Sequence, residues 1–266
     1  MKIWVLALNT FRGFLRDKLI IVFFIFFACV VLLLVSPLLA LKAVHGPEAR
    51  AAQTLVFSLV SSIMYLVSLC GSVLAAWTGA DSVAAEMKSG TILAVMARPV
   101  KRWEFLIGKF TGVILLMAVY TGLMTGLLYL LFWMGAQRSS ASLWELLAYP
   151  MVRYSIYAAI AMLLVTVMHP VIAWAVTMVL AVLAIVVSPP VEMWPHRLGW
   201  LRDALYAVLP SVGLLSESRF MSLTQSSLKP VPWLDHVTAL AYGLDYALIC
   251  LLLAMWSFHY RSLRRD

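Results

Sequence analysis

Charged residues are scarce in this chain. Only 12% of its 266 residues are charged, whereas 64% are hydrophobic, and the mean hydropathy is +0.96. A soluble domain of this size could not cover so much apolar surface with so few polar groups. The composition therefore excludes a soluble globular protein and predicts an all-α polytopic membrane protein that forms a single transmembrane domain over residues 1–266.

Cysteine is also rare. The three cysteines, Cys29, Cys70 and Cys250, all lie inside apolar runs. Because a disulfide framework needs more cysteines in polar, loop-rich sequence, we interpret these three as small buried hydrophobic residues.

Catalytic and metal-binding motifs are missing as well. Gly108-Lys109 has the final pair of a P-loop, but Trp103 occupies the position of the first required glycine, and no Ser or Thr follows the lysine. The sequence contains no His-Glu-x-x-His, Cys-x-x-Cys or Gly-x-Ser-x-Gly motif, and its five histidines are far apart. We therefore expect a non-catalytic chain that binds no metal and no cofactor.

Long uncharged runs dominate what is present. A helix needs about 20 apolar residues to cross a bilayer, so these runs predict about six spans. The expected spans cover residues 19–41, 51–79, 110–135, 150–168, 170–188 and 238–258. Pro170 divides an uncharged run too long for one span, because proline disfavours helix at the preceding residue, His169. The first run is too long for a signal peptide, so we expect it to remain uncleaved.

The net charge of +8 is distributed as topology determinants, with no concentration that would indicate nucleic-acid binding. With six spans, 12 of the 20 Lys and Arg residues fall on one side, in residues 1–18, 82–109 and 259–266. The positive-inside rule places both termini and the 82–109 loop in the cytoplasm, which predicts a multi-pass protein of the plasma or inner membrane.

The N-terminal 18 residues are amphipathic. Trp4, Leu8, Phe11 and Leu15 recur at helical spacing, with basic residues off that stripe. This pattern predicts a helix in the cytoplasmic interface against membrane lipid, and its alternative is the frayed start of the first span. At the other end, residues 189–237 are rich in proline and predict a long external loop before the sixth span, with a short amphipathic helix over residues 198–209.

One acidic residue, Asp245, lies inside an expected span. Proton-coupled carriers use buried ionisable relays, so Asp245 supports a secondary transporter or channel as an alternative function. The other interpretation places Asp245 near the outer end of its span, where it reaches interfacial water. The general scarcity of charge in the spans argues against the carrier.

The 82–109 loop is the most structured polar segment. Gly90 can end the helix that continues from the second span, and Thr91 can cap a new short helix of mostly apolar residues over 91–97, which Pro99 ends. Such a helix, with an apolar face and a basic rim, is either an interfacial anchor or an element that docks into a groove of a soluble partner.

This loop resembles the loop between the second and third spans of ABC-2 type transporter permeases. The resemblance rests on Glu86, Gly90-Thr91, Pro99-Val100, Arg102 and Gly108-Lys109 at these spacings. It is nearest to the branch associated with multi-copper enzyme maturation, which includes the permease for nitrous-oxide reductase assembly. The motif covers about 25 residues, and the six expected spans agree over the rest of the chain.

The resemblance implies that the loop carries a cytoplasmic coupling helix seated on a separate ATPase. It assigns ATPase coupling to one set of residues: Glu86, Gly90, Thr91, Ile92, Leu93, Met96, Arg98, Pro99, Arg102 and Lys109. Among these, Ile92, Leu93 and Met96 are the docking side chains, and Arg102 and Lys109 are basic contacts to the partner or to lipid. ATP and Mg²⁺ belong to the partner ATPase, and the permease pairs with a second permease chain as a homodimer.

Two Gly-x-x-x-Gly pairs, Gly108 with Gly112 and Gly122 with Gly126, lie in or beside the third span. Glycines four apart let helices approach closely, either within one chain or across a dimer interface. Together these features predict the permease subunit of an ATP-driven exporter that moves a substrate or does mechanical work across the membrane. A secondary transporter using Asp245 and a membrane assembly scaffold are the alternatives.

Overall fold

The computed structural model describes residues 2–41, 49–89, 102–134, 143–187, 205, 209–210, 215 and 233–261. This part of the chain forms helices and no strands. Its seven helices are α1 (Lys2–Arg16), α2 (Lys18–Leu41), α3 (Ala49–Ser89), α5 (Arg102–Met134), α6 (Leu143–Val165), α7 (Pro170–Val187) and α9 (Trp233–Arg261).

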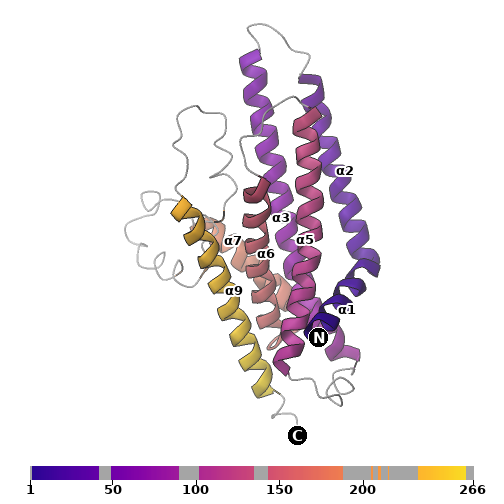
Figure 1. Ribbon diagram of the computed structural model, residues 1–266, viewed down its shortest axis with the longest axis vertical. Helices are drawn as coiled ribbons and strands as arrows, with labels where there is room; N and C mark the ends of the chain where they lie inside the picture. Colours follow the sequence, from indigo (N-terminus) through magenta and orange to yellow (C-terminus); the bar gives the residue numbers. More distant parts are fainter. Residues whose placement is uncertain are drawn as a thin grey trace.

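The long helices form an elongated bundle (Figure 1). α2, α3, α5, α6 and α9 follow the long axis, α7 passes behind α6, and α1 lies across one end of the bundle beside α5 (Figure 1). Both chain termini are at this end, together with the last turn of α3 and the first turn of α5 (Figure 1). We refer to it as the terminal end, and to the level at which α6 and α9 begin, short of the far ends of α2, α3 and α5, as the opposite end (Figure 1).

Four stretches are long and apolar enough to cross a membrane, namely Tyr65–Ala85, Trp103–Leu127, Trp144–Val165 and Trp233–Phe258. α2 and α7 contain shorter apolar stretches, Ile20–Val30 and Pro170–Ala184. The chain is therefore a membrane protein with several apolar helices, and the division into six spans stays a prediction.

The helices extend beyond the expected spans. α3 continues ten residues past residue 79 to Ser89, and α6 begins at Leu143 and includes Pro150. Proline has no N–H to donate, so the carbonyl of Leu146 lacks its usual intrahelical partner. The Thr125 hydroxyl of α5 lies 3.5 Å from that carbonyl oxygen and donates to it. A proline is tolerated in a membrane helix when a neighbouring hydroxyl satisfies the freed group.

The turn between α6 and α7 lies where His169-Pro170 suggests a break. α6 ends at Val165, and α7 begins at Pro170, a favoured first position of a helix. The amide of Ala173 donates to the carbonyl of His169 at 2.9 Å, which starts the new helix.

The core of the bundle is centred on α6. In its apolar stretch, Trp144–Val165, 78% is buried inside the chain. α3 packs on α6 through small residues spaced by four, Gly71, Ala75 and Gly79. A Cβ atom at Gly79 would lie 2.7 Å from the carbonyl oxygen of Ala158, so the two backbones are in close contact. α9 is much less buried, because only 28% of its apolar stretch, Trp233–Phe258, is covered by the rest of the chain.

Candidate functional site

The amphipathic helix α1 is held against the first turns of α5. A Cβ atom at Gly108 would lie 2.8 Å from Cβ of Leu6, and one at Gly112 would lie 2.7 Å from Cβ of Thr10 and 2.9 Å from the Ala7 carbonyl oxygen. These two glycines therefore let α1 approach α5 closely within one chain.

The second glycine pair faces no other helix in the described part of the chain. Gly122 and Gly126 are exposed, and no described atom lies within 4 Å of a Cβ atom built at either position. This stretch of α5 is therefore open to lipid or to another molecule. The two glycine pairs have the same spacing in the sequence, but their surroundings in the structure differ.

Lys109 differs from its expected place at the surface. It is 7% exposed, and its ammonium lies 5.6 Å from the centre of the Phe105 ring in a cation–π contact. Phe105 in turn stacks on Phe258 of α9 at a ring distance of 6.3 Å. In the single chain the lysine is thus packed between helices, and it offers little surface to a partner or to lipid.

The other expected coupling residues are located only in part. Glu86 belongs to the last turns of α3, and Arg102 begins α5. Both helix ends lie at the terminal end of the bundle (Figure 1). Gly90, Thr91, Ile92, Leu93, Met96, Arg98 and Pro99 lie outside the described residues. The expected external loop is likewise described only at residues 205, 209–210 and 215.

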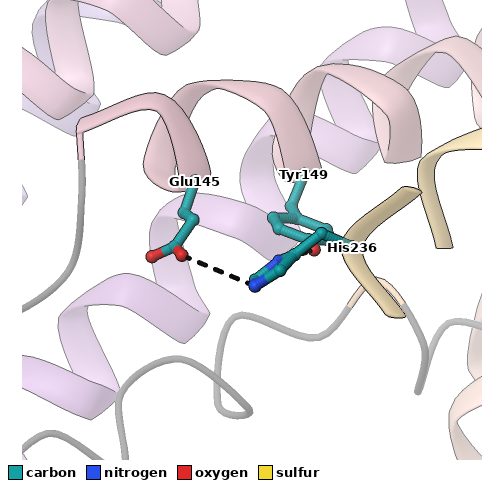
Figure 2. A network of polar contacts seen from close by, with 3 residues as sticks. All are labelled: Glu145, Tyr149 and His236. Atoms are coloured by element: carbon teal, nitrogen blue, oxygen red, sulfur yellow. Dashed lines mark hydrogen bonds and ion pairs between the residues drawn. The ribbon is translucent and has the colours of Figure 1, made fainter. Parts of the chain in front are cut away.

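A polar cluster joins α6 to α9 at the opposite end. Figure 2 shows Glu145 and Tyr149 of α6 beside His236 of α9. The Tyr149 hydroxyl and Nδ1 of His236 are 2.6 Å apart and share a hydrogen bond, and Nε2 of His236 lies 3.9 Å from Oε1 of Glu145. Trp144 and Trp233 place their rings 5.2 Å and 6.2 Å from the imidazole. Sequence analysis missed this cluster because its residues are far apart in the chain.

One turn deeper on the same face of α6, a buried cation connects three segments. Arg153 is 9% exposed, and its guanidinium donates hydrogen bonds to the Ser68 hydroxyl of α3 and to the carbonyl of Leu215. Leu215 is 1% exposed and belongs to the segment between α7 and α9. The arginine therefore connects this residue to the helix bundle.

The start of α6 differs from the start of the expected fourth span. The expected span began at residue 150, whereas α6 begins at Leu143. Arg153 lies inside α6 among buried residues. Thr125 donates to the carbonyl that Pro150 leaves without its intrahelical partner, and Ser68 accepts from the Arg153 guanidinium. A buried arginine that donates hydrogen bonds to a hydroxyl and a carbonyl group is compatible with a membrane helix.

Asp245 occupies the middle of α9. Trp233, 70% exposed, begins this helix, and Trp256, 63% exposed, lies about 35 Å further along at helical rise. Asp245 is about 17 Å along the helix from each tryptophan, and its side chain is exposed. Asp245 therefore lies near the middle of the apolar stretch Trp233–Phe258. A charged aspartate at the centre of a bilayer costs about 2.5–3.5 kcal/mol.

The groups that could carry chemistry are therefore at separate places in the bundle. Among the described residues, no group of three or more His, Cys, Asp or Glu side chains is arranged to hold a metal ion. The arrangement offers two kinds of function: transmission of movement between the two ends of the bundle, and contact with a polar group at mid-span.

Comparison with known proteins gives a family match. A family model described as "ABC-2 family transporter protein" matches residues 4–263, which is nearly the whole chain. None of the curated proteins compared matches the chain.

Proposed function

The chain belongs to the ABC-2 transporter family, which makes it the permease subunit of an ABC transporter, and we propose that a separate cytoplasmic ATPase drives it as an exporter. The observation that carries the proposal is the family match over residues 4–263. Permeases of this family work in general with an ATPase partner. The exporter direction and the particular ATPase are the parts that we add.

The ends of α3 and α5 support the proposed place of docking. α3 ends at Ser89 and α5 begins at Arg102, and both ends lie beside the two termini (Figure 1). Basic residues concentrate in this part of the sequence, which suits a cytoplasmic side. We propose that residues 90–101 form the coupling element and that movement of the ATPase reaches the membrane at this end of the bundle.

Packing suggests how such a movement spreads. α1 is seated on Gly108 and Gly112, and Phe105 stacks on Phe258, so α1, α5 and α9 are in contact near the proposed docking site. α3 contacts α6 along its small residues, and α6 reaches His236 and Leu215 at the opposite end. Closely packed helices transmit displacement because they resist compression. A push on α3 and α5 therefore reaches the far side through α6.

The finer parts of the function remain proposals. We propose that two copies of the chain pair as a homodimer around the transport path, with Gly122 and Gly126 as an open face for close helix contact. The branch associated with multi-copper enzyme maturation stays a prediction from the 86–109 motif. Either substrate movement or mechanical work on an external client fits a permease of this kind.

Co-purification tests the proposed function. We expect the tagged chain, extracted in mild detergent, to retain a P-loop ATPase, and a Glu86→Ala, Arg102→Glu double variant to lose it or to uncouple its ATP hydrolysis. Lys18→Glu is the matched control, because Lys18 is an exposed basic residue at the terminal end but outside the 82–109 loop. Well-folded wild-type protein without any ATPase, even after crosslinking, would contradict the proposal.

The carrier alternative makes a different prediction. A secondary transporter moves its substrate in vesicles without nucleotide, driven by an ion gradient. Transport that needs ATP and the partner ATPase, and that ignores the gradient, removes this alternative.

A further inference from the structure

The exposed face of α9 carries a carboxylate where lipid tails are expected. Leu244, Leu248 and Ile249, the neighbours of Asp245 on this helix, are 56%, 55% and 55% exposed. They suit hydrocarbon, and Asp245 between them does not, because intramembrane acids face protein or water and pair with polar groups. Among the described residues, no hydrogen bond or ion pair engages the Asp245 side chain. In the working assembly this face of α9 must therefore meet something other than lipid alone.

Polar residues continue from Asp245 toward the opposite end of the bundle. Tyr242, Thr238 and Asp235 precede Asp245 at intervals of three and four residues, which places all four on one side of the helix. Thr238 and Asp235 are exposed, and Tyr242 is half-buried. On the same side in the other half of α9, the exposed residues are Ile249, Leu252 and Trp256. The polar stripe thus runs from the middle of the span to one membrane surface only.

We propose that Asp245, with Tyr242 beside it, is a binding position for an amphiphilic organic cation on its way to the external side of the membrane. The proposal rests on the exporter function above and names its substrate class. The carboxylate supplies the charge complement, and the Tyr242 ring, which lies 6.4 Å from that of Tyr246, supplies an aromatic face of the kind that attracts ammonium and phosphonium groups. Thr238 and Asp235 continue the polar stripe outward.

Charge complementarity favours a cation over a second copy of the chain that would place its own Asp245 opposite this one. Across a two-fold axis, a second copy brings the same surface, and hence a second carboxylate, to the same depth. Two carboxylates in close contact repel unless they share a proton. The one described arginine inside the spans, Arg153, is buried and donates to Ser68 and Leu215. The chain therefore offers no exposed cation at mid-span within its described part.

The expected size of the cation follows from the lack of a set of ligands that could enclose a small ion among the described residues. A small metal ion needs several oxygen or nitrogen ligands, and the described residues hold no group of three acidic, His or Cys side chains. A large cation with delocalised or shielded charge keeps its apolar groups against Leu248 and lipid while its charge meets one carboxylate. Asp245 on an apolar helix face suits such a ligand.

Binding of tetraphenylphosphonium to the purified complex in lipid nanodiscs tests the proposal. Tetraphenylborate, of similar size and opposite charge, is the matched ligand, and empty nanodiscs give the lipid background. We expect saturable binding of the cation above that background and none of the anion. Asp245→Asn should weaken cation binding by roughly tenfold or more, because it removes the charge and keeps the shape. Asp245→Glu, which keeps the carboxylate, should restore it.

Leu244→Asn is the control variant. Leu244 precedes Asp245 on α9 and is exposed at about the same depth, but it projects from the helix in a different direction. It should leave cation binding within about twofold of wild type. Equal binding of the two ions, or cation binding that Asp245→Asn leaves unchanged, overturns the proposal. So does disulfide crosslinking between two copies through Asp245→Cys, with none through Leu244→Cys in the same cysteine-free background, since it places a second chain on this face.

The same samples separate this inference from the proposed function. If the ATPase co-purifies and hydrolyses ATP while no cation binds, the substrate class is wrong and the permease function stands. If the cation binds to a chain that retains no ATPase, the binding position stands and the ATP-driven exporter does not.

Discussion

The contact between α3 and α6 at Gly79 gives the sharpest test of the packing. A Cβ atom at this position would lie 2.7 Å from the Ala158 carbonyl oxygen, 3.0 Å from its Cα and 3.3 Å from its carbonyl carbon. All three are backbone atoms of a buried helix, so no side-chain rotation can move them away. Gly79→Ala therefore forces α3 and α6 apart by several tenths of an ångström.

The expected cost follows from that displacement. Overfilling a tightly packed interior costs typically about 1–3 kcal/mol. Alanine recovers roughly 0.5–1 kcal/mol because glycine is the poorer residue in a helix interior. Gly122→Ala on α5 makes the same chemical change where no described atom lies within 4 Å, so only the favourable part applies. The two variants should therefore differ in free energy of unfolding by about 1–3 kcal/mol, with Gly79→Ala the less stable.

Unfolding by denaturant in a mild detergent, followed by circular dichroism, measures this difference. Both variants must be compared with wild type under conditions in which refolding is reversible, because an irreversible transition reports a rate. The reasoning is refuted if Gly79→Ala is as stable as Gly122→Ala.

Three further outcomes are expected. Gly112→Leu should push α1 off α5, since a Cβ atom alone would already lie 2.7 Å from Thr10, and protease should then cleave α1 faster, whereas Gly126→Leu, in open space, should leave cleavage unchanged. Arg153→Met should lower the free energy of unfolding by about 1–3 kcal/mol, because a buried hydroxyl and a carbonyl lose their donor; stability equal to wild type would show that these hydrogen bonds are not needed. Tyr149→Phe should cost about 0.5–1.5 kcal/mol through loss of the hydrogen bond to His236, measured by the same unfolding curves, and no loss would refute that bond.

Several parts of the fold follow directly from local sequence. The apolar runs predicted helices that the structure contains, and His169-Pro170 predicted the turn before α7, because the effect of proline on the preceding residues is local. The 1–18 pattern predicted an amphipathic helix, and α1 covers Lys2–Arg16. The start of α6 at Leu143 did not follow, because the helix continues through Pro150, whose missing N–H leaves a carbonyl that Thr125 of α5 satisfies.

The candidate sites depended more on tertiary contacts. The repeat of Gly71, Ala75 and Gly79 was available in the sequence as small residues four apart, a signal that could have indicated the α3–α6 contact. No comparable signal connects Tyr149 with His236, which are 87 residues apart. Asp245 was recognised in the sequence, but its exposure and its mid-span position needed the observed limits of α9.

The sequence by itself determined that this is a helical membrane protein and where its apolar helices lie, and it predicts which side its basic residues favour. These properties depend on the transfer of local segments from water to lipid, and each segment carries that information alone. Only the tertiary structure decided that Lys109 and Arg153 are buried, that Gly108 and Gly112 receive α1, and that Asp245 is exposed. Those outcomes depend on which helix faces pack together, and packing is set by the shapes of residues distant in the chain.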